Sequence, residues 1–251
     1  MRAGRAARRD RQGETFVFAS IVAAGAGQAG PPQLHAPDGF LSLPIAVVMW
    51  AVTALVTAYA VKRTNETFDE RAIPLMGVTA AFIFAAQMFN FQVVGGTSGH
   101  LLGGVLAAIL LGPWAGTLVM VAVVAVQGLV FQDGGLVVMG ANIFNMGLIG
   151  TIGGYAVYRA LCAALGGEQR GRIPAAGVAA WISVVAAATA MSIQLGLSGT
   201  TDLQVALTAM LTVHVPIGIG EALITMAALG FIRVTRPDLF GLRDARVAAA
   251  T

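Results

Sequence analysis

Long apolar runs separated by short polar connections fill the chain from residue 43 onward. Seven runs can be distinguished, at 43–61, 73–89, 101–112, 114–131, 137–158, 173–195 and 204–232. A helix needs about 20 apolar residues to cross a bilayer, and most of these runs approach that length. The pattern therefore predicts an all-α integral membrane protein with about seven transmembrane helices.

The third and fourth runs are separated only by Gly112-Pro113, so they form either one long helix or a hairpin. The basic residues distinguish these arrangements. Outside the first 33 residues, all ten Lys and Arg residues fall at 62–71, at 159–172 or after residue 232. Cytoplasmic connections of membrane proteins are enriched in Lys and Arg. Only a hairpin at Gly112-Pro113 places all three groups on one side of the membrane.

This topology puts the N-terminal segment 34–42 outside and the C-terminal tail in the cytoplasm. The run 101–112 is short for a span because a helix rises only ~1.5 Å per residue. We therefore expect a partial helix there. Beyond residue 33, the basic residues are confined to cytoplasmic connections on this interpretation, so no nucleic-acid partner is expected.

The composition supports a membrane protein. Hydrophobic residues make up 57% of the chain and charged residues 11%, against about 25% charged in soluble domains. The 32 glycines allow helices to approach closely within a bilayer. The single cysteine, Cys162, excludes an intrachain disulfide and a thiolate metal cluster.

The first 33 residues differ from the rest. They begin with five arginines and continue with one modest apolar run, FVFASIVAAGAG at 16–27. This run is too short to cross a bilayer of ~30 Å. We interpret 1–33 as a signal-like segment or translated upstream sequence, 34–234 as the membrane domain and 235–251 as a cytoplasmic tail.

Two of the three histidines, His35 and His100, fall on the predicted outer side. Imidazole binds nickel, copper, zinc and cobalt, so both are candidate metal ligands. Alternatively, His100 hydrogen-bonds a loop carbonyl. Further polar residues are candidates for supporting or coupling roles, namely Asp38, Asn90, Gln92, Thr97, Ser98, Asn142 and Asn145. Asp38 can equally form an ordinary turn with Gly39, and the two asparagines can join helices by hydrogen bonds.

His214 and Glu221 lie within the last apolar run, seven residues apart and so on one helix face. Glu221 is the only carboxylate inside the predicted spans. Ionisable residues inside a membrane are candidates for function by default. The alternative is a partnered carboxyl that organises helix packing. We predict that both tune transport or packing and do not bind metal directly.

Several blocks in consecutive order resemble the CbiM/NikM family, the substrate-binding membrane components of energy-coupling-factor cobalt and nickel transporters. HAPDGFLS at 35–42 is similar to the family's Met-His-Ile-Pro-Asp-Gly signature. The other blocks are GGTSGHLLGGVLAAILLGPWAG at 95–116, DGG at 133–135, GANIFNMG at 140–147 and HVPIGIGEALIT at 214–225. The resemblance covers about residues 34–232.

The resemblance implies a divalent metal bound by four nitrogens. These are the α-amine of Leu34, the backbone nitrogen and side chain of His35, and the side chain of His100. It also implies transported Co²⁺ or Ni²⁺ in place of a permanent cofactor, and a multi-pass protein of the bacterial cell membrane. The implied partners are a small CbiN/NikN-like subunit, a CbiQ-like coupling protein and CbiO-like ATPase subunits. The Pro-Asp-Gly form of the signature favours nickel.

The implied site requires a free amine at Leu34, which is joined to Gln33 in this sequence. Initiation at position 34, where leucine codons can serve as bacterial starts, would supply methionine with that amine. Signal-peptide cleavage is the alternative, although Pro31-Pro32-Gln33 lacks the small-residue cleavage pattern. We therefore expect the active protein to start at position 34.

The chain contains no Walker A pattern, so the energy for transport is expected from separate ATPase subunits. Two alternatives remain open from the sequence. One is a membrane metalloenzyme that uses His35, His100, His214 and Glu221, although the chain lacks HExxH. The other is a membrane protein whose histidines are purely structural.

Overall fold

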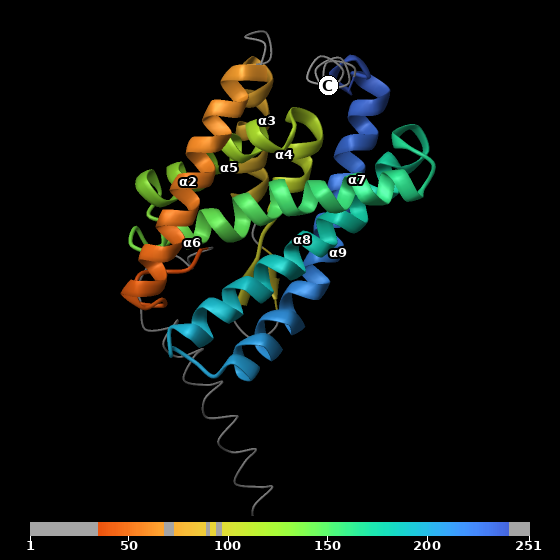
Figure 1. Cartoon of the computed structure of the whole chain (residues 1–251). Helices are drawn as coiled ribbons and strands as arrows, with labels where there is room; N and C mark the ends of the chain where they lie inside the picture. The colour runs from red at the N-terminus through yellow and green to blue at the C-terminus, as the bar shows by residue number, and fades with distance from the viewer. Residues whose placement is uncertain (1–34, 68–72, 89–90, 94–96, 241–251) are drawn as a thin grey trace, which may run out of the picture.

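The computed structural model describes residues 35–67, 73–88, 91–93 and 97–240 (Figure 1). Helices α2 (Leu43–Thr67) and α3 (Ile73–Met88) come first, followed by strands β1 (Phe91–Val93) and β2 (Thr97–Gly99). The remaining elements are α4 (Gly104–Leu111), α5 (Pro113–Val130), α6 (Met139–Asn142), the π-helix η2 (Ile143–Gly153), α7 (Gly154–Ala164), α8 (Glu168–Leu197) and α9 (Leu203–Thr235). Elements α6, η2 and α7 follow one another without a break and form one continuous helical segment.

Four helices of the described part are long and apolar enough to cross a membrane. They are α2, α5, α8 and α9, and α3 is a shorter apolar helix. Many large apolar side chains on these helices face outward, including Leu55, Leu129 and Phe231. An outward-facing apolar surface of this kind is suited to lipid. The helical membrane class predicted from the sequence is therefore supported.

The short helix α4 lies at the centre of the helical core. All eight of its residues are buried, and at ~1.5 Å per residue it extends only ~12 Å. Gly112 ends it with a φ of 83°, and α5 begins at Pro113. The predicted break and partial helix are confirmed. Two glycines bring backbones together here, since a Cβ on Gly116 would lie 3.0 Å from Ala108 Cα, and one on Gly104 would lie 2.9 Å from Gly150 Cα.

Two features differ from the sequence prediction. First, the chain is not purely helical, because β1 and β2 pair as an antiparallel hairpin with Phe91 opposite Gly99. Second, the 159–172 connection is mostly helical. Only residues 165–167 separate α7 from α8, and two of them are glycines with positive φ. The charged residues of this connection stabilise the extended helix ends, since Glu168 pairs with both Arg159 and Arg172.

Candidate metal centre

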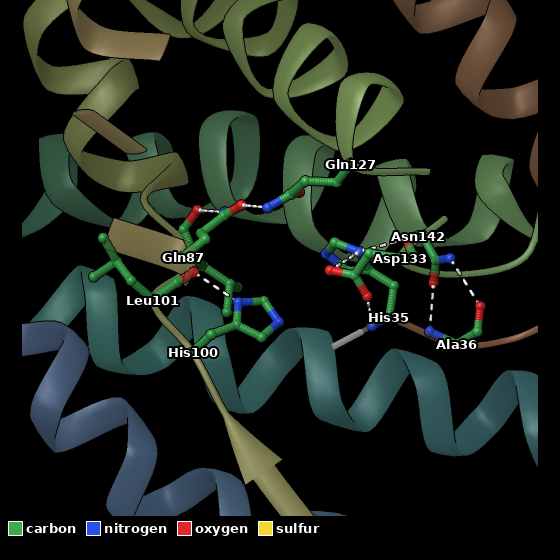
Figure 2. A network of polar contacts seen from close by, with 9 residues as sticks. His35, Ala36, Gln87, His100, Leu101, Gln127, Asp133 and Asn142 are labelled. Atoms are coloured by element: carbon green, nitrogen blue, oxygen red, sulfur yellow. Dashed lines mark hydrogen bonds and ion pairs between the residues drawn. The ribbon is translucent and has the colours of Figure 1, made fainter. Parts of the chain in front are cut away.

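The N-terminal segment, residues 35–42, leads into α2 and inserts its first histidine into the protein. His35 is only 5% exposed. Its backbone N–H donates to Asp133 Oδ1 at 3.3 Å, and its ring Nδ1 donates to the Asp133 carbonyl oxygen at 3.0 Å. Figure 2 shows these contacts. The other ring nitrogen, Nε2, is buried and has no hydrogen-bond partner within the described part of the chain. Asp133, in the loop before α6, therefore holds both the backbone and the ring of His35.

The Asp133-Gly134-Gly135 sequence explains how this segment fits. Gly134 has a φ of 97°, and a Cβ on it would lie 2.6 Å from His35 Cβ. A Cβ on Gly135 would collide with the backbone nitrogen and carboxylate of Asp38. Both positions need glycine because the N-terminal segment lies directly against their backbone. The aspartate holds His35, and the glycines leave room for it.

Two further residues fasten the N-terminal segment to the start of α6. The Asp38 carboxylate accepts the backbone N–H groups of Leu136, Val137 and Val138 at 2.8–3.2 Å. The Asn142 side chain accepts from Ala36 N–H at 3.2 Å and donates to the Ala36 carbonyl at 3.1 Å. Asp38 and Asn142 thus support the position of His35. Asp38 itself lies in a turn, as one interpretation of it expected, and its carboxylate accepts the N–H groups of residues that lead into α6.

His100 lies between β2 and α4 and is 9% exposed. Its Nδ1 donates to the Leu101 carbonyl oxygen at 2.9 Å, as the alternative reading of this residue expected. The neutral ring that makes this bond carries its lone pair on Nε2. The His35 and His100 rings meet edge to face, with centroids 5.4 Å apart and planes at 82°. The structure therefore brings together two histidines that are 65 positions apart in sequence.

Burial lowers the pKa of His35 below its ordinary value, while the carboxylate charge and the backbone hydrogen bond of Asp133 oppose that shift. The imidazole is accordingly neutral at neutral pH. Only the neutral ring offers a nitrogen lone pair to a metal ion. The environment of His35 thus favours the form of the side chain that binds metal.

A second polar network holds the chain just after His100. Glu221 accepts the backbone N–H groups of Leu102 and Gly103 at 2.8 and 2.9 Å. Gln87 donates to the Leu102 carbonyl at 2.7 Å, and Gln127 donates to Gln87 Oε1 at 2.8 Å (Figure 2). All three side chains are buried. This network joins α3, α5 and α9 at the loop that carries His100.

Sequence reasoning did not single out Gln87, Gln127 or the individual role of Asp133. A signal was present, because each glutamine is a lone amide inside an apolar run. Such an amide needs a hydrogen-bond partner within the protein when it lies in a bilayer. The partner itself, a backbone carbonyl brought in by a distant loop, becomes evident only from the fold.

The remaining candidate residues have other hydrogen-bond partners, belong to the β1–β2 hairpin or lie outside the described part. Asn145 forms a reciprocal amide pair with Gln194 of α8 at 2.8–2.9 Å, and so joins helices as the alternative expected. His214 Nδ1 donates to the Met210 carbonyl one turn earlier at 2.8 Å. Gln92, Thr97 and Ser98 belong to the β1–β2 hairpin. Leu34 and Asn90 lie outside the described residues. Within the described ranges, no three His, Cys, Asp or Glu side chains cluster as a metal site.

The chain is similar to known metal transport proteins. The CbiM family, described as the cobalt uptake substrate-specific transmembrane region, matches residues 35–239. A putative fused nickel transport protein NikMN of Archaeoglobus fulgidus is 41% identical over 208 residues, which is 82% of this chain and 68% of that protein. A putative cobalt transport protein CbiM of Methanococcus voltae is 31% identical over 82% of this chain and 94% of its own length. A crystal structure of a truncated transition metal transporter is similar with a TM-score of 0.73 and 33% identity, over 79% of this chain and 97% of that one.

Proposed function

This chain belongs to the CbiM family of cobalt and nickel transport components, and from that premise we propose that it captures Co²⁺ or Ni²⁺ for an ATP-driven importer of the energy-coupling-factor type. The observation that carries the proposal is the meeting of two buried imidazoles, His35 and His100, 5.4 Å apart. Imidazole is a preferred ligand for both metals. The neutral state of His35 adds to its fitness as a ligand.

Two imidazoles do not complete a coordination sphere, so further donors must come from nearby. The backbone nitrogen of His35 and the amine of residue 34 are the nearest in sequence. Amine, backbone nitrogen and ring Nδ1 close two small chelate rings around one ion, and His100 supplies the fourth nitrogen. Because Nδ1 of His35 donates to Asp133, this chelate requires the ring to turn over about its Cβ–Cγ bond. The tetragonal nitrogen set favours Ni²⁺.

The chelate also requires that residue 34 carry a free amine. In a peptide bond to Gln33, its nitrogen is an amide, and a second amide proton, besides that of His35, would have to be lost before it could donate. We propose that the active protein begins at position 34, by initiation there or by cleavage. The start of the family match at residue 35 supports this proposal.

The orientation that we propose places the metal site on the outer face. Figure 1 draws the end of α2, the α7–α8 turn and the end of α9 toward the top of the view, and these segments carry or adjoin the three basic groups. The α8–α9 turn and the N-terminal segment lie toward the other end. With basic connections in the cytoplasm, residues 35–42 face outward. Seven membrane passes, one of them partial, remain part of this proposal.

Energy would come from partner subunits. Several relatives, including that of Archaeoglobus fulgidus, are described as fused NikMN proteins. This supports a small NikN-like or CbiN-like partner for the present chain. A CbiQ-like coupling protein and CbiO-like ATPases complete the proposed importer, which resides in the bacterial cell membrane.

Metal accumulation tests the function. Cells that express this protein with its partners should accumulate radioactive nickel or cobalt above cells without it. His100→Ala should abolish the gain, because one of four donors is lost. The control is Gln204→Ala, which shortens an exposed side chain at the start of α9 and should leave accumulation unchanged. Accumulation that survives His100→Ala with the protein present at normal abundance would refute the ligand role. Metal binding by the pure protein without any uptake would favour the metalloenzyme alternative.

A further inference from the structure

Glu221 is a carboxylic acid buried in the middle of α9. Its side chain is 2% exposed, and α9 is one of the helices able to cross a membrane. A carboxylate in such a place costs free energy unless strong hydrogen bonds compensate it. Because burying this carboxylate costs free energy, we expect Glu221 to stabilise a particular conformation of the chain around it.

Both oxygens of Glu221 accept hydrogen bonds from neighbouring backbone groups of the His100 loop. Oε2 accepts from Leu102 N–H at 2.8 Å, and Oε1 accepts from Gly103 N–H at 2.9 Å. These two N–H groups precede α4, so no helical carbonyl is available to them. The negative side chain also lies at the N-terminal end of α4, where the helix dipole favours it.

The same short peptide is held from the opposite side. Gln87 of α3 donates to the Leu102 carbonyl at 2.7 Å. Gly103 has a φ of 79°, and a Cβ on it would lie 2.7 Å from Ile83 Cγ2, also on α3. The peptide 102–103 is therefore fixed between α3 and α9. A displacement of either helix would move it.

This peptide adjoins the group that orients His100. The ring Nδ1 of His100 donates to the carbonyl of Leu101, the residue immediately before the held peptide. We propose that Glu221 is a positioning residue for the metal ligand His100. It acts through the backbone of residues 101–103, with Gln87 as its counterpart across the loop. This inference rests on the proposed metal-binding function and gives α9 a direct mechanical connection to the site.

The test compares metal binding by Glu221→Gln with that of a matched control. Glutamine has the same size but presents an amide N–H₂ to one of the two backbone donors, so one hydrogen bond is lost. The control is Thr225→Val, one turn later on α9, which replaces a fully buried hydroxyl that has no hydrogen-bond partner among the described residues. Ni²⁺ is titrated into the purified full protein, and its visible absorption spectrum is recorded.

We expect Glu221→Gln to weaken Ni²⁺ binding about 10- to 100-fold, the range typical for partners that orient metal ligands. The absorption band should shift, because a displaced imidazole changes the ligand field. Thr225→Val should leave both affinity and spectrum unchanged. Gln87→Met, which removes the opposing hydrogen bond at similar volume, should act in the same direction as Glu221→Gln. If Glu221→Gln does not fold, the Ni²⁺ affinity and spectrum of Gln87→Met test the positioning role instead.

Unchanged affinity and spectrum in folded Glu221→Gln and Gln87→Met would overturn the proposal and leave Glu221 with a packing role. Loss of fold in both, with Thr225→Val intact, would overturn it equally. A wild-type protein that binds no Ni²⁺ or Co²⁺ would instead count against the metal-binding function itself. The two failures are therefore distinguishable.

Discussion

At the scale of single residues, most contacts of the candidate site come from residues that position the backbone around the candidate ligands, and fewer come from the candidate ligands themselves. Asp133 binds His35 through both its backbone and its side chain, and Asp38 holds the start of α6. Gly134 leaves the space in which His35 lies. The DGG sequence is therefore a receptor for the N-terminal segment. Its contribution is to hold the N-terminal segment beside the His100 loop; the proposed chelate would then require both bonds from His35 to Asp133 to be broken.

Gly134→Ala tests this receptor. The new Cβ would lie 2.6 Å from His35 Cβ, at a φ of 97° that L-residues rarely adopt. Such backbone strain costs roughly 1–3 kcal/mol, and the collision should displace His35. We expect a lower melting temperature and metal affinity reduced at least about tenfold, a change worth ~1.4 kcal/mol. Isothermal titration on the folded variant measures this.

Gly167→Ala is the matched control for strain. Gly167 has a φ of 94°, no atom of the described residues lies within 4 Å of a Cβ placed there, and it belongs to the turn between α7 and α8. This variant should lose stability without losing affinity. Equal metal affinity in Gly134→Ala and wild type would show that close approach at Gly134 does not matter for binding.

At the scale of elements, the short hairpin of α4 and α5 anchors the His100 loop to the protein core. Helix α4 is buried along its whole length, and its start is bonded to Glu221 of α9. The His100 loop is therefore not a free surface loop, because its C-terminal end is part of the core. The topology of this hairpin also determines which side of the membrane each connection faces.

Cysteine labelling tests that topology. In a Cys162→Ser protein, Gln204→Cys at the start of α9 should react with a membrane-impermeant maleimide applied to intact cells. Asn65→Cys near the end of α2 should react only after the cells are opened. Both native side chains are exposed, so burial does not account for a difference. The opposite pattern of labelling would invert the proposed orientation, and labelling of both from outside would exclude the seven-pass topology.

The sequence predicted some of these elements and not others for physical reasons. The break at Gly112-Pro113 was evident because glycine and proline interrupt helices and the charge pattern required a turn there. The β1–β2 hairpin was missed because strands of three residues carry too few positions to show a period. The π-helical geometry of η2 was also missed. Its apolar composition is that of an ordinary span, and its close approach to α4 at Gly150 depends on the fold.

The charge pattern predicted that His35 and His100 lie on the same outer side of the membrane, but it did not predict that their rings meet. Charge distribution gave that placement, and family resemblance gave their proposed partnership. The residues that hold them in place could not be inferred. Gln87 and Glu221 act on a backbone segment that lies far from them in sequence, and only the folded structure brings these groups into contact.

At the scale of the whole molecule, the two ends of the helical bundle differ in character. One end carries the ion pairs of Glu168 with Arg159 and Arg172, and the Arg172 guanidinium lies 4.2 Å above the Phe240 ring. The other end buries His100 and His35 of the N-terminal segment. A charged end and a candidate metal site on opposite sides of an apolar bundle suit the proposed subunit, which would bind an ion outside and meet its partners inside.

Nickel titration of two N-terminal forms tests the central claim most directly. Protein that begins at position 34, its terminus verified by intact mass, should bind one Ni²⁺ per chain. Affinity should increase with pH, because binding releases protons from the nitrogen donors. Protein that keeps residues 1–33 should bind poorly or not at all, since its residue 34 nitrogen belongs to a peptide bond. Equal affinity in the two forms would contradict the account, because the metal would then be held without the free amine on which the proposed site depends.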